Sequence, residues 1–440
     1  MKKNEKFIAR CIGYNKEGMG IVRHDNFVIF VPGLINGELA EILVLKVLRT
    51  YGFGKVEKLI EVSEHRIEPK CSVYKKCGGC HLQHMDRIEQ AAFKKQLVKD
   101  CFYNIAHMDV AVQDVVDMEY PYRYRNKVQV PFKEENGQLN VGFYRQHSNN
   151  IVEFDDCLVQ TTTSNELVKF IKNEVENLGV GKYFRHILIK HAHNTNEIMV
   201  VLVTSQYPFA NVELLANAIV NNFSEVVSVI VNVNNQDTNV VLGEKEYVVA
   251  KGNLIKEELS GMYFNISSKS FYQINPIQTK KLYEKAIELA AIGESDNVID
   301  LYCGTGTIGL LASHKAKKVI GIEIVPAAIE DAKINAKNNG VNNIEFICAD
   351  AKKGAQMLIE RNEKVDVVIV DPPRKGCDQK TIDAINTFNP RRLVYVSCDP
   401  ATLARDVERL GVYGYKPQVI QPVDMFPLTS HVETVCLLKK

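Results

Sequence analysis

Three cysteines lie close together in the first fifth of the chain, at Cys71, Cys77 and Cys80. Gly78 and Gly79 separate the last two and give the backbone room to wrap around an inorganic centre. Thiolates bind zinc in sets of four, and they bind iron-sulfur clusters in the same number. The spacing predicts a metal site that needs one more ligand, and its chemistry permits zinc almost as readily as a 4Fe-4S cluster.

A glycine turn follows an apolar run within residues 298–309. Gly304, Gly306 and Gly309 fit the dinucleotide-binding fingerprint, which by itself is a weak signal. Asp300 adds a carboxylate at the expected strand end, just ahead of the turn. This charge would repel a pyrophosphate and attract the ammonium group of a methionine moiety. The pattern therefore favours S-adenosylmethionine over a nicotinamide cofactor.

Two further acids, Glu323 and Asp350, end the next two expected strands. Either acid alone is better explained as a helix cap or a surface carboxylate. Ligands of open α/β sheets, however, bind outside the carboxyl ends of the strands. Acids at three successive strand ends therefore favour a cofactor site, with Glu323 at the ribose hydroxyls and Asp350 on the adenine side.

Cys398 follows another apolar run, residues 392–397, and should lie on the same edge of the sheet. A thiolate that adds to carbon 6 of a pyrimidine makes carbon 5 able to accept a methyl group. Cys303 and Cys377 are rival nucleophiles at the same edge. Cys398 is preferred because prolines at 372, 373 and 400 stiffen loops that could hold a flat ring. This position predicts methylation of a pyrimidine through a covalent adduct.

Such a reaction also needs a base that removes the proton of carbon 5, so that the thiolate can leave. Glu433 lies at the start of an expected strand near the C-terminus. From the residues alone, a base and a solvated strand residue explain it equally well.

The elements that carry these residues fall into three regions. Residues 1–60 contain short strands at 8–12, 27–31 and 41–47 with glycine turns, which predict a small β-barrel. The central region has an α+β pattern, with helices at 86–106 and 212–223 and strands at 127–132, 187–191 and 198–204. From about residue 277 strands and helices alternate, which predicts a parallel sheet covered on both faces, with strands at 297–301, 319–324, 344–349, 365–370 and 392–397.

Residues 120–127 interleave aromatic rings with cations, a composition suited to stacking bases and holding phosphates. We therefore predict that Tyr122, Arg123, Arg125 and Lys127 bind RNA. A polar strand edge with core tyrosines is the other explanation of this segment.

The composition, with 46% hydrophobic residues, 24% charged residues and a net charge of +1, excludes a disordered or collagen-like chain. It provides no global attraction for a polyanion, so an RNA site must be a local patch. No apolar stretch approaches the roughly 18 residues that span a bilayer, and no apolar signal core follows the N-terminus. We expect a cytoplasmic monomer that has no membrane association and no obligate protein partner.

Five motifs together resemble the RNA 5-methyluridine methyltransferase family, and within it the bacterial 23S ribosomal RNA uracil-5-methyltransferases that have a TRAM domain and an iron-sulfur cluster. The motifs occupy residues 271–275, 300–306, 371–374, 397–400 and 431–434. The resemblance implies a multidomain fold: an OB-like TRAM barrel at 1–60, a central α+β iron-sulfur and RNA-binding domain at 61–260, and a Rossmann-like methyltransferase domain at 261–440. Asp399 departs from the Asn that is common in the family, which weakens any hydrogen-bonding role for this residue.

The resemblance also implies roles for single residues. Gln273, Tyr302, Glu323 and Asp371 would contact S-adenosylmethionine, Cys398 would be the nucleophile and Glu433 the base. Cys157 would complete a structural 4Fe-4S cluster with the three earlier cysteines. The substrate would be 23S ribosomal RNA, with the uridine splayed out of its helix. The alternatives are a transfer RNA uridine-5-methyltransferase, an RNA cytosine-5-methyltransferase and a non-catalytic iron-sulfur RNA-binding factor.

Overall fold

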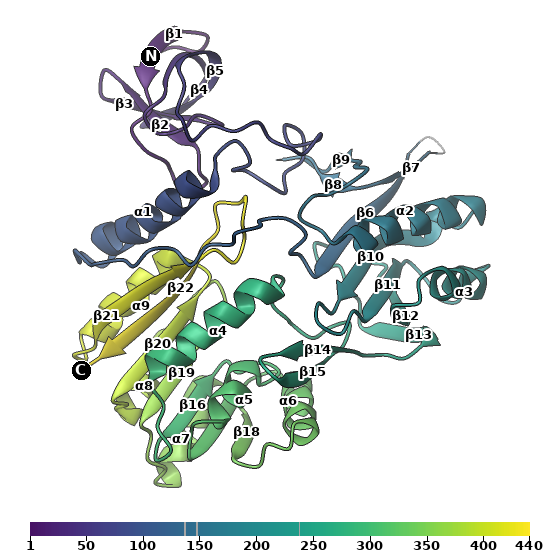
Figure 1. The fold of residues 1–440 in the computed structure, drawn as a ribbon, viewed down its shortest axis with the longest axis vertical. Helices are drawn as coiled ribbons and strands as arrows, with labels where there is room; N and C mark the ends of the chain where they lie inside the picture. Colours follow the sequence, from purple (N-terminus) through teal and green to yellow (C-terminus); the bar gives the residue numbers. More distant parts are fainter. Residues whose placement is uncertain (136–137, 147, 237) are drawn as a thin grey trace.

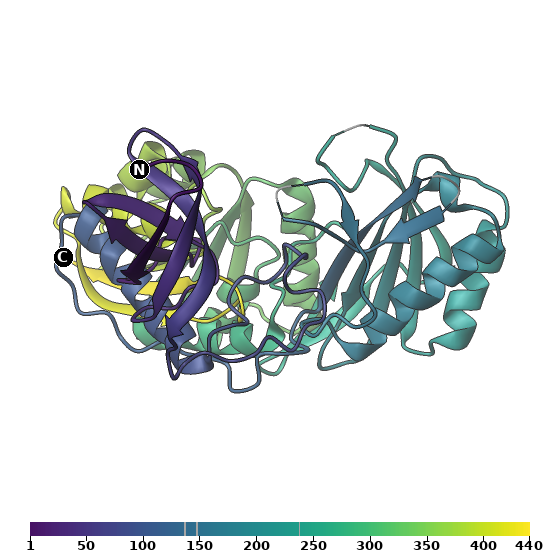
Figure 2. The same cartoon turned by 90° about the horizontal axis from the view of Figure 1, so that it is seen from above.

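The structure is a computed structural model that describes residues 1–135, 138–146, 148–236 and 238–440. It contains three main sheets along the chain, and the central sheet with its helices lies to one side of the other two in both views (Figures 1 and 2). Each main sheet packs a hydrophobic core of its own, so the chain is multidomain. No helix among the described residues is both long and apolar enough to cross a membrane.

The N-terminal sheet has five strands in the order β1-β4-β5-β3-β2. Its first strand begins two residues earlier than the predicted 8–12, because Phe7 faces the core while Ile8 and Ile12 are exposed. The bounds are β1 Lys6–Arg10, β2 Gly20–His24, β3 Phe27–Val31, β4 Leu39–Val47 and β5 Tyr51–Glu61.

The central sheet has the order β13-β12-β11-β10-β6-β7, and α2 and α3 pack on one face (Figure 1). The hairpin β14-β15 leads from this sheet to the C-terminal part of the chain. The bounds are β6 Lys127–Glu135, β7 Gln138–Val141, β8 Phe143–Tyr144, β9 Ile151–Val152, α2 Thr162–Asn177, β10 Phe184–His191, β11 Ile198–Thr204, α3 Val212–Asn222, β12 Val226–Val233, β13 Lys245–Lys251, β14 Ile255–Leu259 and β15 Met262–Ile266.

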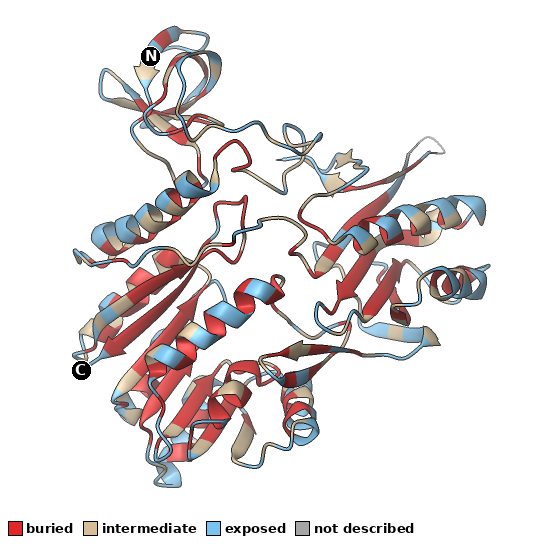
Figure 3. Cartoon of the chain, viewed as in Figure 1, coloured by how far each residue is buried: buried red, intermediate tan, exposed pale blue. Residues whose placement is uncertain are grey.

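The C-terminal sheet has seven strands in the order β18-β17-β16-β19-β20-β22-β21, and its interior is almost wholly buried (Figure 3). Its first five strands are parallel, and β22 runs antiparallel to both β20 and β21. The strand bounds are β16 Asn297–Leu301, β17 Lys318–Glu323, β18 Ile344–Cys348, β19 Val367–Val370, β20 Arg392–Ser397, β21 Lys416–Val423 and β22 Glu433–Lys439.

Helices cover both faces of this sheet, as the continuously apolar strands predict. One core joins α4, α5 and α6 to one face, and a second core joins α1, α7, α8 and α9 to the other. Helix α1 therefore packs on the C-terminal sheet although it precedes the central sheet in the chain. The helix bounds are α1 Arg87–Ile105, α4 Pro276–Ala290, α5 Thr307–Ser313, α6 Pro326–Asn338, α7 Ala351–Glu360, α8 Gln379–Phe388 and α9 Pro400–Gly411.

Candidate active site

The glycine turn connects β16 to α5 in a backbone shape that depends on positive φ angles. Tyr302, Gly304 and Gly306 have φ of 64°, 54° and 83°. A Cβ atom on Gly306 would lie 2.9 Å from the ring of Phe346. Gly306 is thus required by the turn and by close packing, and it does not line the cavity described below.

Asp300 lies beneath this turn with no exposed surface. Its Oδ2 accepts a hydrogen bond of 2.8 Å from the backbone N–H of Gly309, and Oδ1 has no hydrogen-bond partner among the described residues. Burial raises the pKa of Asp300 to about 8. A buried acceptor without a partner at the wall of a cavity fits a ligand that brings a donor or a positive charge.

Glu323 shapes the same turn from the end of β17. Its carboxylate accepts hydrogen bonds from the backbone N–H groups of Gly304, at 3.2 Å, and Val325, at 2.9 Å. Asp350 instead caps α7, where it accepts from the backbone N–H of Lys353 at 3.0 Å. It lines an adjoining cavity that shares Tyr302 and Glu323 with the main one.

The main cavity has a volume of about 630 Å³ and lies at the carboxyl edge of the parallel strands. It brings together eight of the ten residues predicted for catalysis and cofactor binding, and it leaves out Gly306 and Asp350. The eight are Gln273, Asp300, Tyr302, Gly304, Glu323, Asp371, Cys398 and Glu433.

The pairing of β20 with β22 explains why Cys398 and Glu433 meet. The last pair in the antiparallel register joins Ser397 to Thr434, so the next residues outward, Cys398 and Glu433, stand opposite each other. Side chains alternate between the two faces of a strand, so Glu433 lies on the same face of β22 as Val435 and Leu437, which pack in the core under α4. Both reactive side chains therefore reach the cavity from neighbouring strands.

Burial and like charge raise the pKa values of these groups. The pKa of Cys398 is raised to about 11 by desolvation and by the charges of Glu433 and Asp371. The pKa of Glu433 is raised to about 8 by desolvation and by Asp371, whose own pKa desolvation raises to about 7. Arg374 opposes the shifts of Cys398 and Glu433. Two carboxylic acids poised near neutral pH are suited to proton transfer.

The rival cysteines are placed differently. Cys303 is 7% exposed and burial raises its pKa, although it does line the cavity. Cys377 is 1% exposed, lies outside this cavity and has a pKa raised to about 12 by burial. Cys398 is half-buried, so it is the most accessible of the three.

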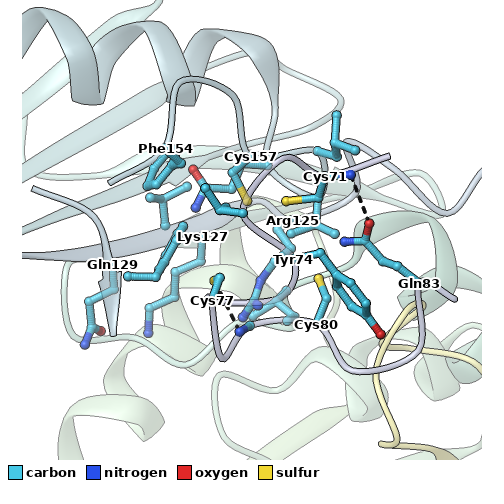
Figure 4. A pocket seen from close by; sticks show the side chains of 18 residues that line it. Cys71, Tyr74, Cys77, Cys80, Gln83, Arg125, Lys127, Gln129, Phe154 and Cys157 are labelled. Atoms are coloured by element: carbon cyan, nitrogen blue, oxygen red, sulfur yellow. Dashed lines mark hydrogen bonds between the residues drawn. The ribbon is translucent and has the colours of Figure 1, made fainter. Parts of the chain in front are cut away.

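A second cavity, of about 370 Å³, is lined by Cys71, Cys77, Cys80 and Cys157. Their sulfur atoms surround a common space (Figure 4). Burial raises the pKa of Cys80 to about 12 and that of Cys157 to about 11, and the other thiols add to both shifts. Among the described parts of the chain, no set of three or more His, Cys, Asp or Glu side chains is arranged to hold a metal ion.

Comparison with known proteins identifies the family. Residues 86–440 match the model of the tRNA (Uracil-5-)-methyltransferase family, and residues 12–56 match the TRAM domain. The chain belongs to the RNA uracil-5-methyltransferase family. It is therefore an enzyme that uses S-adenosylmethionine to methylate uracil in RNA.

Relatives and a solved structure match this methyltransferase over its full length. RNA methyltransferases of Clostridium tetani and Oceanobacillus iheyensis are 45% and 43% identical to it over 446 and 448 residues. Each alignment covers 100% of this chain and 97% of the relative. A crystal structure of Pyrococcus abyssi tRNA (uracil-54, C5)-methyltransferase with S-adenosyl-L-homocysteine has a TM-score of 0.77 and 27% identity, covering 99% of this chain and 100% of that one.

The segment predicted to bind RNA lies where the methyltransferase fold meets the cysteine cavity. Arg123 forms a two-pronged ion pair with Asp156, at 2.7 and 2.6 Å, and also donates to the carbonyl of Cys157. Arg125 and Lys127 line the cysteine cavity (Figure 4), and Lys70 stands 5.3 Å above the ring of Tyr122. RNA binding by the four residues remains a prediction, and for Arg123 it competes with the ion pair.

Asn126, between two of these residues, was not singled out by the sequence. Its side-chain amide donates to the carbonyl of Gln273 at 2.9 Å, and its backbone N–H donates to Ile274. Lys190 holds the preceding turn through the carbonyls of Ser267 and Ser270, at 2.7 and 2.8 Å. These contacts fix the segment that carries Gln273 into the methyltransferase cavity.

Further residues of the cavity were given no role from the sequence, among them Tyr283, Arg374 and Phe426. Arg374 had a sequence signal, because it stands in the proline motif that follows β19. In the structure its positive charge lowers the pKa values of Cys398 and Glu433. Tyr283 lies in the middle of α4 and Phe426 in a loop, where no local pattern marks them.

Proposed function

We propose that this enzyme methylates carbon 5 of a uridine in 23S ribosomal RNA through a covalent bond between Cys398 and carbon 6. The observation that carries the proposal is the opposed pair of Cys398 and Glu433 in the cavity formed by the glycine turn. The cavity also fits the methyl donor, since Oδ1 of Asp300, which has no partner in the described part of the chain, offers an acceptor to a positively charged ligand.

The steps assigned to the chain follow from the protonation of its groups. S-adenosylmethionine supplies an electrophilic methyl group carried on a sulfonium. The Cys398 thiol passes its proton to the carboxylate of Asp371, which leaves Glu433 free to act later, and its sulfur adds to carbon 6, which places electron density on carbon 5. Arg374 offsets the negative charge that accumulates here. Once carbon 5 has been methylated, Glu433 takes its proton, and the bond between sulfur and carbon 6 breaks to restore the double bond.

Transfer RNA is the second candidate substrate, and the solved structure favours it. The Pyrococcus abyssi enzyme, whose substrate is tRNA uracil-54, matches 99% of this chain, so the match extends over the N-terminal sheet as well. An N-terminal TRAM region therefore does not by itself exclude transfer RNA. The proposal for 23S ribosomal RNA is supported by the four-cysteine cavity together with the sequence resemblance.

We expect methyl-labelled S-adenosylmethionine to label 23S ribosomal RNA when the enzyme is incubated with total RNA. The label should appear as 5-methyluridine after digestion to nucleosides. Purified 23S ribosomal RNA and transfer RNA, incubated separately, serve as the matched substrates. Label only in transfer RNA would establish the second candidate, and label in 5-methylcytidine would identify a cytosine enzyme.

We also propose that Cys71, Cys77, Cys80 and Cys157 hold a 4Fe-4S cluster. We assign the cluster a structural role because methyl transfer to an activated pyrimidine requires no electron. The donor set fits this group: four half-buried thiols line one cavity, and the backbone N–H of Gly79 donates to the sulfur of Cys77 at 3.4 Å. A single zinc would draw the sulfurs to about 3.8 Å from one another, since Zn–S bonds are about 2.3 Å. The sequence resemblance, rather than the arrangement of the described thiols, favours the larger group.

Protein purified without oxygen should therefore be brown and contain about four irons per chain. Metal analysis and the visible absorption spectrum measure this directly. Cys157→Ser should lower the iron content, whereas Cys348→Ser, at an exposed cysteine that does not line the cavity, should leave it unchanged. One zinc per chain without iron would contradict the cluster and leave the catalytic assignment intact.

A further inference from the structure

The loop of residues 424–432, between β21 and β22, delivers two groups to the active-site cavity. Phe426 lines the cavity from within the loop, and Glu433 follows directly after it as the first residue of β22. Lys94 of α1 holds the start of the loop, where its buried ammonium contacts Asp424 at 2.5 Å and the carbonyl of Phe426 at 3.1 Å. The middle of the loop is held by a different part of the chain.

That second attachment is at Leu428, which has a positive φ of 67°. Its carbonyl accepts hydrogen bonds from the backbone N–H groups of His81, at 2.9 Å, and Leu82, at 3.0 Å. Its own N–H donates to the side chain of Gln90 at 3.0 Å. A leucine keeps this backbone conformation only where its surroundings enforce it, so these contacts determine the path of the loop.

The same residue packs against the cysteine cavity. The side chain of Leu428 is 2% exposed and lies in a small core with Tyr124, and Cys80 and Cys157 pack against that core. His81, which holds the carbonyl of Leu428, comes directly after Cys80 in the chain. Both the backbone and the side chain of Leu428 are thus attached to the segments that supply two of the four thiols.

We propose that the four-cysteine site is the anchor of the 424–432 loop, and that Leu428 is a positioning residue that aligns Glu433 for the removal of the carbon 5 proton. This inference rests on the proposed function, in which Glu433 is the base. It assigns the cysteine site a specific effect on catalysis, because the site would support the removal of the carbon 5 proton by Glu433.

The attachment predicts which step changes when it is weakened. Cys398 lies at the junction of β20 and α9, and Asp371 lies at the end of β19; neither belongs to the loop. Adduct formation and methyl transfer should therefore slow less than proton removal, although Phe426 of the loop also lines the cavity. Proton removal depends on the position of Glu433, and a displacement of about 1 Å can slow such a step by about 10²-fold. The methylated covalent complex should then accumulate.

Leu428→Ala tests this, with Leu215→Ala as the matched control. Leu215 is a fully buried leucine of α3 in the central core and touches neither the loop nor the cysteines. With ordinary RNA, Leu428→Ala should turn over about 10²-fold more slowly and retain methylated RNA on denaturing gels, while Leu215→Ala should retain none. Equal slowing of adduct formation and product release in Leu428→Ala would show a general structural role and overturn the inference.

Amide hydrogen exchange tests the link to the cysteines without measuring activity. Removal of iron from the anaerobically purified protein with ferricyanide and EDTA should raise exchange in the peptide covering 424–433 and leave that of α3 unchanged. No change in the 424–433 peptide would overturn the anchor. If α3 also exchanges faster because the protein unfolds, the Leu428→Ala result decides.

Glu433→Gln in the same gel assay separates this inference from the proposed function. If Glu433→Gln accumulates the complex and Leu428→Ala does not, the positioning role is wrong and the base assignment stands. If neither variant accumulates it, the base assignment is wrong and the positioning role for it fails with it, while the exchange experiment still decides whether the cysteine site anchors the loop.

Discussion

Cys398→Ala is expected to abolish both methylation of RNA and covalent capture of the enzyme by RNA that contains 5-fluorouridine. Turnover should fall by at least about 10⁴-fold, the order of loss typical of removing an enzyme's nucleophile. The physical reason is that carbon 5 of uracil becomes reactive only while sulfur is bonded to carbon 6. Fluorine at carbon 5 cannot leave as a proton does, so the parent enzyme should remain attached to the modified RNA on denaturing gels.

Cys303→Ala is the control for this experiment, because Cys303 lines the same cavity. It should still be captured by the fluorinated RNA. Capture of Cys398→Ala together with loss of capture in Cys303→Ala would reverse the assignment of the nucleophile.

The pH dependence of Cys398 has a defined direction. Its pKa is raised to about 11, so the thiolate fraction of the ligand-free enzyme rises about tenfold per pH unit between pH 7 and 9. Alkylation of Cys398 by iodoacetamide, followed by peptide mass spectrometry, should rise in the same proportion. Free cysteine, with a pKa of about 8.5, should approach a plateau near pH 9. Arg374→Gln should slow the alkylation, since Arg374 lowers the pKa of this thiol.

Glu433→Gln is expected to accumulate a methylated covalent complex with ordinary RNA. Addition of Cys398 and methyl transfer precede the step in which Glu433 acts, so both should survive the substitution. Turnover should fall by roughly 10² to 10⁴-fold, the usual contribution of a general base. Denaturing gels detect the complex, and label from the methyl donor shows that the trapped RNA carries the methyl group.

Two controls make this result specific. Glu433→Asp keeps a carboxylate and should recover part of the turnover. Glu433→Gln should not lower the free energy of unfolding. The pKa of Glu433 is raised to about 8 in the folded protein, so the folded parent loses stability as pH rises from about 4.5 to 8, and the neutral glutamine does not share this loss. A melting temperature at pH 8 no lower than that of the parent checks this. Normal turnover without a trapped complex would mean that another group takes the proton.

The sequence by itself determined the parallel sheet and the edge on which chemistry occurs. Strand β16 was predicted at its observed bounds because a buried parallel strand is a short, continuously apolar run and its turn needs glycine. Parallel strands present their carboxyl ends on one edge, so Asp300, Glu323 and Asp350 could be expected to lie near each other. Asp300 and Glu323 do line the main cavity, whereas Asp350 lines only the adjoining one. These are local signals that a single stretch of chain carries.

Only the tertiary structure decided how distant segments meet. The antiparallel insertion of β22 beside β20 sets Glu433 opposite Cys398, and no local pattern reports that register. The same holds for Arg123, whose charge is directed to Asp156, and for Leu428, whose conformation is held by residues more than 300 positions earlier. Local sequence sets the conformational preferences of each element, whereas the pairing of elements depends on contacts between residues far apart in the chain, which only packing of the whole molecule selects.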